Sequence, residues 1–271
     1  MRVVVCAMAK NEHLYINEWV KHYLALGVDH IYLYDNDDLN SCYIADFIDK
    51  DLLDRVTIKN IRGLRREHLQ NDVYTSFYGK YGKEFDYALF CDIDEFLTGT
   101  DNIKKWLSTL NNPQQIRIKW KLFGDDNVIE RDMTIGVKDF FKKEVTKSLH
   151  RNLKEKGDLE IQGKFILKGN MTNVWFYSVH FAKNSLNQKI LSSVLPSGAP
   201  CYSGVRIYED YSQETIYLNH YMTKTLSEFI AQKLNRNDAV FNQKLKLDYF
   251  WRINEKTEQK VQFLRNKGLI K

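Results

Sequence analysis

Residues 87–97 read YALFCDIDEFL, an apolar run that passes into a cluster of acidic residues. Its first five residues are apolar or aromatic and predict a β-strand buried on both faces, as in a sheet covered by helices. The strand ends in Asp92-Ile93-Asp94. Because residues two apart in an extended chain point to the same side, the two carboxylates are expected to share one face where the strand ends.

The sequence on either side alternates strand-like and helix-like segments. Asn11 is expected to cap the first helix, and Gly27 to end it. This alternation implies an α/β fold, Rossmann-like, with a mostly parallel sheet flanked by helices. The spacing of apolar residues predicts strands at 2–8, 30–34, 55–60 and 115–123 and helices at 14–26, 44–50, 67–81 and 103–110.

Polar clusters follow three of the predicted strands. Ligands of parallel α/β sheets bind beyond the carboxyl ends of the strands, so all three clusters are expected to meet at one edge. The clusters are Lys10-Asn11-Glu12, Asp35-Asn36 and Asp92-Ile93-Asp94.

The pattern loosens after residue 125. Residues 186–212 contain two of the three prolines and predict a long loop or lid. From residue 225 to the end, the apolar spacing predicts amphipathic helices. The remaining apolar runs predict strands at 164–168, 175–181 and 215–218.

The composition narrows the class of protein. Of the 271 residues, 44% are hydrophobic and only 3 are proline, which excludes a disordered or collagen-like chain. No apolar run approaches the roughly 18 residues of a membrane span. The opening MRVVVCAMAKNE predicts a buried strand and not a signal peptide. Four cysteines without a CxxC pair favour free thiols in a reducing compartment, so we expect a cytoplasmic protein.

The net charge of +5 is unevenly distributed. Residues 224–271 hold 11 basic and 5 acidic side chains, a net charge of +6, whereas residues 1–223 hold 29 and 30. We therefore expect a near-neutral body, 1–223, and a basic helical extension, 224–271. Such an extension suits contact with a membrane surface or a lipid-diphosphate acceptor, and a helical cap on the core explains the same pattern.

The paired aspartates are the strongest chemical signal. Asp92 and Asp94 supply the hard oxygen ligands that Mg²⁺ or Mn²⁺ prefers, and such a metal would neutralise a diphosphate leaving group. His220, at the end of a strand, is a candidate to complete the metal shell, and His180 has the same context and is its rival. Lys224 follows at a helix start, where it suits phosphate oxygens. A solvated acidic turn is the alternative for the aspartates.

Two further groups are candidates for binding the donor. Asp35 and Asn36 are placed to accept hydrogen bonds from a base or a ribose, and an Asx-type turn explains them equally well. Arg66, beside Arg65, is a candidate for contact with phosphate or a sugar acid, with a solvated charge pair as the alternative.

Carboxylates that are candidates for a general base follow Phe123-Gly124. Asp125 or Asp126, with Glu130 behind them, is a candidate to deprotonate an acceptor hydroxyl. A type I turn of Gly-Asp-Asp-Asn explains the same residues.

Four ordered blocks resemble glycosyltransferases of the GT-A fold, of the family 2 and family 92 kind. Together they cover residues 1–125 and 215–236. The blocks are KNEHLYINEWVKHYLALGVDHIYLYDND at 10–37, EFDYALFCDIDEFL at 84–97, IRIKWKLFG at 116–124 and IYLNHYMTKTLSEFIAQKLNR at 216–236.

The resemblance implies a UDP-sugar donor and a divalent cation, Mn²⁺ or Mg²⁺. It implies that the first strand-to-helix turn and Asp35 contact the nucleoside, that Asp92 and Asp94 bind the metal and diphosphate, and that His220 and Lys224 are a metal ligand and a phosphate contact. The turn at 124–127 is Gly-Asp-Asp-Asn and departs from the small residues usual there. The residues of the first turn are Ala9, Lys10, Asn11 and Glu12.

We therefore expect a catalytic body with a nucleotide-sugar half, 1–125, and an acceptor half, 126–223, that serves polysaccharide biosynthesis. It would move a hexose from a UDP-sugar to a hydroxyl of a glycan or lipid-linked glycan, with inversion. Two alternatives remain: a phosphohydrolase with Asp92 as nucleophile, and a basic nucleic-acid-binding protein. The second has only the basic extension in its favour, so no nucleic-acid partner is expected.

Overall fold

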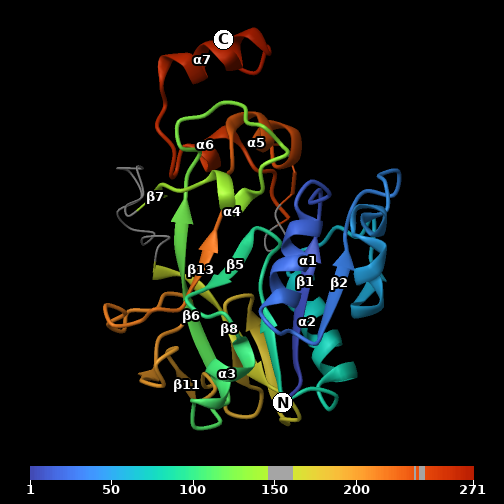
Figure 1. The fold of residues 1–271 in the computed structure, drawn as a ribbon, viewed down its shortest axis with the longest axis vertical. Helices are drawn as coiled ribbons and strands as arrows, with labels where there is room; N and C mark the ends of the chain where they lie inside the picture. Colours follow the sequence, from blue (N-terminus) through green and yellow to red (C-terminus); the bar gives the residue numbers. More distant parts are fainter. Residues whose placement is uncertain (146–160, 235, 238–241) are drawn as a thin grey trace.

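A computed structural model describes residues 1–145, 161–234, 236–237 and 242–271 (Figure 1). Part of the predicted acceptor half, 146–160, lies outside the described residues. So do residue 235 and residues 238–241 of the predicted helical extension.

The centre of the fold is a parallel sheet. β1 pairs in parallel with β2 on one side and with β4 on the other, and β2 pairs in parallel with β3. The strand order β3-β2-β1-β4 therefore brings the carboxyl ends of these strands to one edge (Figure 1). Their bounds are Val3–Ala9 for β1, His30–Asp35 for β2, Val56–Asn60 for β3 and Tyr87–Phe90 for β4.

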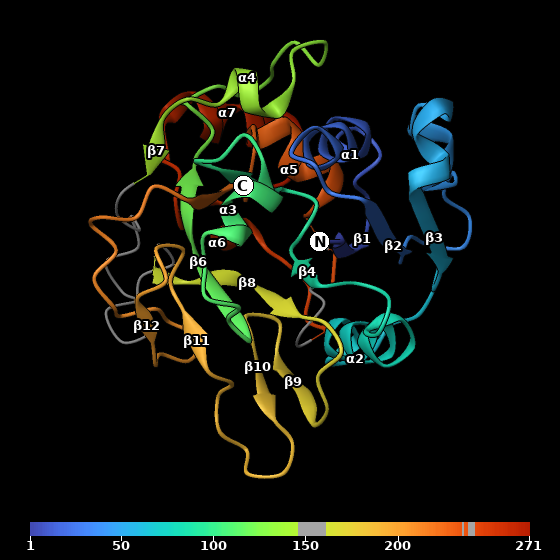
Figure 2. The same ribbon diagram turned by 60° about the horizontal axis from the view of Figure 1, so that its bottom comes forward.

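Beyond β4 the sheet becomes mixed. β8 runs antiparallel between β4 and β6, and β13 lies between β5 and β6. The bounds are Glu95–Thr98 for β5, Gln115–Phe123 for β6, Glu144–Val145 for β7, Gly163–Lys168 for β8, Ser193–Val194 for β11, Pro200–Cys201 for β12 and Tyr217–His220 for β13. A separate hairpin joins β9, Val174–Ser178, to β10, Phe181–Asn184 (Figure 2).

The helices lie on both faces of the sheet and above its carboxyl edge. Two 3-10 turns, Ile44–Phe47 and Lys50–Arg55, connect β2 to β3. The α-helices are α1 at Ile16–Ala25, α2 at Leu69–Tyr81, α3 at Ile103–Ser108, α4 at Val137–Phe140, α5 at Leu226–Gln232, α6 at Leu247–Phe250 and α7 at Glu258–Asn266. None of the helices within the described residues is long and apolar enough to cross a membrane.

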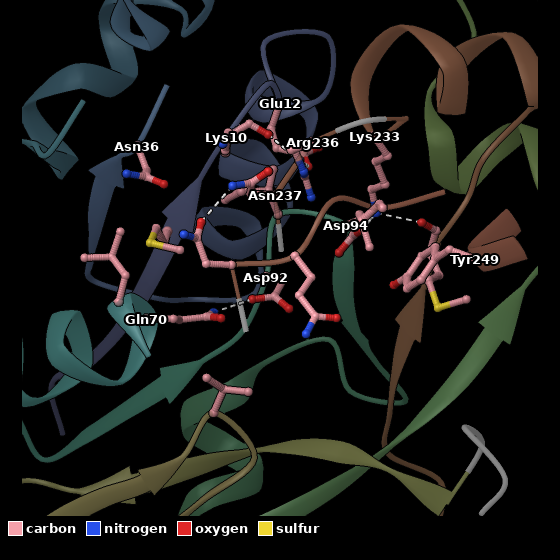
Figure 3. Close-up of a pocket in the computed structure, with 18 of the residues that line it drawn as sticks. Lys10, Glu12, Asn36, Gln70, Asp92, Asp94, Lys233, Arg236, Asn237 and Tyr249 are labelled. Carbon is pink, nitrogen blue, oxygen red and sulfur yellow. Dashed lines mark hydrogen bonds and ion pairs between the residues drawn. The ribbon is translucent and has the colours of Figure 1, made fainter. Parts of the chain in front are cut away.

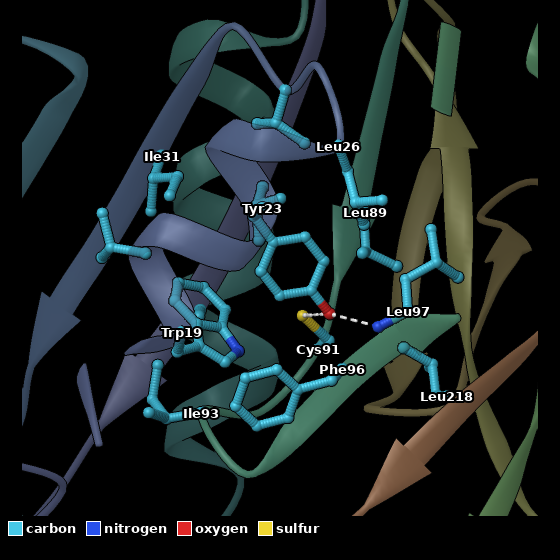
Figure 4. Packing of buried hydrophobic residues seen from close by; sticks show 14 of the residues in the cluster. Trp19, Tyr23, Leu26, Ile31, Leu89, Cys91, Ile93, Phe96, Leu97 and Leu218 are labelled. Atoms are coloured by element: carbon cyan, nitrogen blue, oxygen red, sulfur yellow. Dashed lines mark hydrogen bonds between the residues drawn. The ribbon is translucent and has the colours of Figure 1, made fainter. Parts of the chain in front are cut away.

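The two faces of β1 bury side chains in two cores. Val3, Val5 and Ala7 face the core under α1, whereas Val4 and Cys6 face the core under α2. This alternation follows from the two-residue period of a strand. In the first core, α1 places Trp19 and Tyr23 over the sheet (Figure 4). Burial on both faces explains why β1 and β4 read as unbroken apolar runs.

The structure confirms the mostly parallel α/β fold and corrects three local predictions. Asn11 does not cap α1, because Tyr15 is its N-cap; Asn11 instead has a φ of 57° in the preceding turn. The single strand predicted at 175–181 is wrong, because a turn at Val179-His180 divides it into β9 and β10. The loop predicted at 186–212 contains the short strands β11 and β12.

The predicted helical extension contains α5, α6 and α7, and a non-helical segment interrupts it. Leu245 donates its backbone N–H to the carbonyl of Arg236 at 2.8 Å, and Asn237 forms a β-bridge with Lys244. Residues 242–246 therefore fold back on 236–237 and separate α5 from α6. Thr257 starts α7 anew, because its side chain accepts the N–H of Lys260.

Candidate active site

Helix α1 fixes the turn that carries the two aspartates. The indole N–H of Trp19 donates to the carbonyls of Asp92, at 3.1 Å, and Glu95, at 3.0 Å. One helical turn later, the Tyr23 hydroxyl donates to the Glu95 carbonyl at 3.0 Å and accepts the N–H of Leu97 at 3.2 Å (Figure 4). Residues four apart share a helix face, so this pair clamps the segment from one side. The aspartates therefore sit on a rigid support.

The three polar clusters predicted at the strand ends meet at one cavity of about 680 Å³ (Figure 3). This volume is in the usual range for a small-molecule site. The cluster residues that line it are Lys10, Glu12, Asn36, Asp92, Ile93 and Asp94.

Asp94 lies between a lysine and a histidine. Lys233 donates from Nζ to Asp94 Oδ2 at 2.5 Å and to the Met222 carbonyl at 2.6 Å. Nε2 of His220 is 3.5 Å from the other oxygen, Oδ1. Burial, the largest single influence, would raise the pKa of Asp94, but Lys233, His220 and Lys224 together outweigh it and hold that pKa well below its usual range. Asp94 is therefore an anion with one oxygen directed toward His220.

Asp92 has partners of its own. Lys164 lies 2.9 Å from Oδ2, and the side-chain amide of Gln70 donates to Oδ1 at 2.6 Å (Figure 3). Burial opposes ionisation, but Lys164 lowers the pKa of Asp92, and Asp92 raises that of Lys164. We call Asp92, Asp94, Lys164 and Lys233 the paired wall, because each carboxylate in it faces one ammonium group.

The paired wall leaves one pair of metal donors. Both Asp92 oxygens and one Asp94 oxygen accept from nitrogen donors, so Asp94 Oδ1 and His220 Nε2 remain facing each other. No group of three or more His, Cys, Asp or Glu side chains within the described ranges is arranged to hold a metal. An oxygen and an imidazole nitrogen suit Mn²⁺ when a diphosphate supplies further oxygens. The donor set therefore fits a cation shared with a ligand.

The strand-end turn after β1 is tied to the segment after α5. Arg236 donates to the Lys10 carbonyl at 2.5 Å and lies 3.2 Å from Glu12 Oε1. Nζ of Lys224 lies 3.6 Å from Glu12 Oε2. Burial, together with Arg65 and Arg236, lowers the pKa of Lys10 to about 8. This end of the cavity thus gathers cations around one carboxylate.

Trp120 of β6 lines the cavity beside the two histidines. Its ring lies 4.5 Å from that of His220 and 5.4 Å from that of His180. The indole N–H is buried without a hydrogen-bond partner, although Trp120 lines the cavity and is 7% exposed. His180 Nδ1 donates to the Gly163 carbonyl at 2.7 Å, which leaves Nε2 as an acceptor. This part of the cavity therefore contains a buried donor without a partner and a histidine nitrogen that can accept a hydrogen bond.

A segment from the basic extension completes the cavity. We call Lys244, Lys246, Asp248 and Arg252 the tail wall, because all four line the cavity and come from residues after 241. Lys244, Lys246 and Asp248 are exposed. The sequence predicted a helical extension here, suited to contact with a membrane surface or a lipid-diphosphate acceptor, but did not predict that these residues line the cavity.

Of the other residues predicted to contact the nucleotide-sugar, some line the cavity and some do not. Asn36 lines the cavity, but its amide donates to the Ile61 and Leu64 carbonyls at 3.1 and 3.0 Å. Asp35 is buried outside the lining and accepts the N–H of Asp37 at 3.0 Å, as in an Asx turn. Arg66 lines the cavity and pairs with Asp72 at 2.9 Å.

The remaining residues predicted to contact the nucleotide-sugar do not line the main cavity. Ala9 is buried in β1, and Asn11 lines an adjoining cavity of about 350 Å³. Lys224 is 2% exposed and does not line the main cavity. Of the two rival histidines, both line the cavity, and only His220 faces Asp94.

The candidate bases Asp125 and Asp126 lie outside the cavity. Asp125 is 3% exposed and forms an ion pair with Lys260 of α7, while Asn254 accepts its backbone N–H at 2.7 Å. Asp126 accepts the N–H of Lys142 at 2.9 Å. Glu130 is exposed and also lies outside the lining. Asp125 and Asp126 therefore hold neighbouring backbone and α7 in place.

Several cavity residues were missed from the sequence. Lys164 had a signal, because it is a charged residue opening the apolar strand KFILK. Lys233 and Arg236 lie inside the last resemblance block but have no local pattern that marks them. Gln70 and Trp120 look like ordinary helix and strand residues.

Comparison with known proteins identifies the family of this chain. A crystal structure of S. aureus TarS is similar over 62% of this chain and 28% of the TarS chain, with a TM-score of 0.37 and 13% identity. The match thus spans less than a third of TarS. A comparison with curated proteins finds no match. The family model described as glycosyltransferase family 92 matches residues 1–261, and the chain therefore belongs to glycosyltransferase family 92.

Proposed function

We propose that the protein transfers a hexose, with inversion, from a UDP-sugar to a hydroxyl of a glycan or lipid-linked glycan, and that the reaction depends on a divalent cation. The observation that carries this proposal is the meeting of Asp94 and His220 at a cavity built from three strand ends. Family membership supplies the reaction class.

The nucleotide diphosphate belongs at the Asp94 end. Asp94 and His220 would hold a Mn²⁺ or Mg²⁺ ion that neutralises the leaving diphosphate. Lys233 helps to keep Asp94 ionised and fixes one of its oxygens, so the other stays directed toward His220. Lys10, Asn36 and Arg236 line the cavity near the ends of β1 and β2, where the nucleoside would lie.

The transferred sugar lies next to the diphosphate, so its hydroxyls meet Trp120 and His180. The indole N–H of Trp120 is a donor without a partner, and Nε2 of His180 is an acceptor. Burial and the charge of Lys164 lower the pKa of His180 to about 3, so its imidazole is neutral at physiological pH.

Asp248 is the carboxylate left to act as general base. Of the four carboxylates among the described lining residues, Glu12, Asp92 and Asp94 each face a cation, whereas Asp248 is exposed on α6. The acceptor oxygen would attack the anomeric carbon as the bond from that carbon to the diphosphate oxygen breaks. UDP leaves with the bonding electrons, and the hydroxyl proton passes to Asp248.

Calorimetric titration with UDP, with and without Mn²⁺, tests this function. We expect Mn²⁺ to tighten UDP binding in the wild type and to lose this effect in Asp94→Asn. Asp210→Asn, at an exposed position outside the cavity, serves as the matched control and should keep it. Equal UDP binding with and without Mn²⁺, or an unaltered metal effect in Asp94→Asn, would count against the proposal.

A further inference from the structure

The cavity carries more positive charge than the proposed donor balances. Among the described residues that line it, nine are Lys or Arg and four are Asp or Glu. The basic residues are Lys10, Arg65, Arg66, Lys164, Lys233, Arg236, Lys244, Lys246 and Arg252, and the acidic ones are Glu12, Asp92, Asp94 and Asp248. With neutral histidines, the net charge of this set is +5.

Much of this charge is matched locally. Lys164 faces Asp92, Lys233 faces Asp94, and Arg236 faces Glu12. Arg65 and Arg66 pair with Asp38 and Asp72, which lie outside the cavity lining. Lys10, Lys244 and Lys246 therefore contribute to the excess that remains.

The donor does not remove the excess on the tail wall. The diphosphate of a UDP-sugar carries two negative charges, and a bound divalent cation cancels them. Lys244 and Lys246 then share the tail wall with one carboxylate, Asp248. Lys244 and Lys246 are exposed, and no carboxylate of the described residues lies within 4.0 Å of either ammonium group.

The tail wall is held in place by backbone pairing. Leu245 donates to the Arg236 carbonyl at 2.8 Å, and the side chains of Asn237 and Asn242 are hydrogen-bonded at 2.8 Å. Because Lys244 and Lys246 flank Leu245, this pairing fixes the backbone of both lysines at the cavity. Two neighbouring ammonium groups on a fixed backbone suit a phosphate, which accepts hydrogen bonds through several oxygens.

We propose that the tail wall binds a phosphate group on the acceptor, close to the hydroxyl that receives the sugar. This inference rests on the proposed glycosyl transfer and names the class of its acceptor. Lys244 and Lys246 contact the phosphate, and Asp248 on the same wall faces the hydroxyl. The phosphate belongs either to a sugar phosphate in solution or to the headgroup of a lipid-linked sugar.

Kinetics with phosphorylated and neutral acceptors test the proposal. UDP release is measured with UDP-hexose and Mn²⁺, using hexose 1-phosphates, the same hexoses without phosphate, and vesicles that contain a polyprenyl-phosphate-linked hexose. In the double variant Lys244→Gln/Lys246→Gln, we expect KM for the phosphorylated acceptor to rise roughly tenfold or more, with UDP affinity unchanged. Lys267→Gln/Lys271→Gln, which removes the same charge from exposed positions outside the cavity, should leave KM unchanged.

The outcomes separate this inference from the proposed function. Turnover with hexose 1-phosphates indicates a soluble phosphate, and turnover only on vesicles indicates a lipid headgroup; both support the proposal. Equal KM values for phosphorylated and neutral hexoses, or the same KM in the double variant and the wild type, would overturn it while UDP binding stays intact. Loss of Mn²⁺-dependent UDP binding in the wild type would instead refute the glycosyl transfer on which it rests.

Discussion

The paired wall and the tail wall line the same cavity but differ in how their charges are balanced. In the paired wall, Asp92 and Asp94 are each matched by one lysine, and Lys164 is 1% exposed. In the tail wall, Lys244 and Lys246 are exposed, and no carboxylate of the described residues lies within 4.0 Å of either ammonium group. A buried charge must be matched within the protein, whereas an exposed charge is free to meet a ligand. The paired wall is therefore built for rigidity, and the tail wall for exchange of an anionic substrate.

The largest expected effect is on the free energy of unfolding, which should differ between variants of the two walls. Lys233→Met leaves the buried Asp94 without its lysine, and we expect a loss of about 3–5 kcal/mol in the free energy of unfolding. Lys244→Met, the same change on the tail wall, should shift it by no more than about 0.5 kcal/mol. Urea unfolding at pH 7 measures both. Similar losses in the two variants would show that the walls do not differ in this way.

The next effect concerns catalysis by the tail wall. Asp248→Asn removes the proposed proton acceptor, so kcat should fall by at least roughly 100-fold. Because Asp248 does not touch Asp94 or His220, UDP affinity should stay the same. Asp125→Asn provides the contrast, since Asp125 pairs with Lys260 away from the cavity. A larger loss of kcat in Asp125→Asn than in Asp248→Asn, with both variants folded, would restore the base expected from the sequence.

A smaller effect tests the part of the cavity where the sugar would lie, beside Trp120. Trp120→Phe keeps an aromatic ring against His220 but removes the indole N–H, which is worth about 1 kcal/mol as one hydrogen bond. Affinity for a UDP-hexose should fall roughly 5-fold while affinity for UDP is unchanged. Competition titrations with the two ligands measure this difference. Equal weakening of both would place the indole against the nucleotide instead.

The smallest effect is a pH dependence at the nucleotide end. Because the pKa of Lys10 is lowered to about 8, Lys10 loses its proton as pH rises through that value. A bound diphosphate would stabilise the protonated form, so UDP affinity should decline by a few-fold between pH 7 and 9. Calorimetry at pH 8 in buffers of different ionisation enthalpy should detect proton uptake on binding. The uptake should vanish in Lys10→Arg, which stays charged, and its persistence there would assign it to another group.

The parts predicted from the sequence are those with local signals. Apolar runs that end in polar clusters identified β1, β2 and β4 and the edge where Asp92 and Asp94 lie, because buried parallel strands have a distinctive composition. His220 was selected from its strand end and lies 3.5 Å from Asp94. Its role as a metal ligand stays a prediction.

The missed parts depend on contacts between distant segments. Lys233 reaches Asp94 across 139 residues of sequence, and no spacing rule links the two. Residues 242–246 have amphipathic spacing, yet they pair with 236–237 instead of continuing a helix. The turn at Asp125 has the composition of an active-site turn, but its ion pair with Lys260 depends on where α7 packs. In each case, contacts between segments that are distant in the sequence determine where the residue lies.

The placement of UDP and the metal against the paired wall is tested most directly by anomalous diffraction. Crystals grown with UDP and MnCl₂ would be measured above the manganese absorption edge. We expect one anomalous peak between Asp94 and His220, with the diphosphate density beside it. Density for UDP together with a manganese peak away from Asp94, or UDP bound outside the 680 Å³ cavity, would contradict this placement.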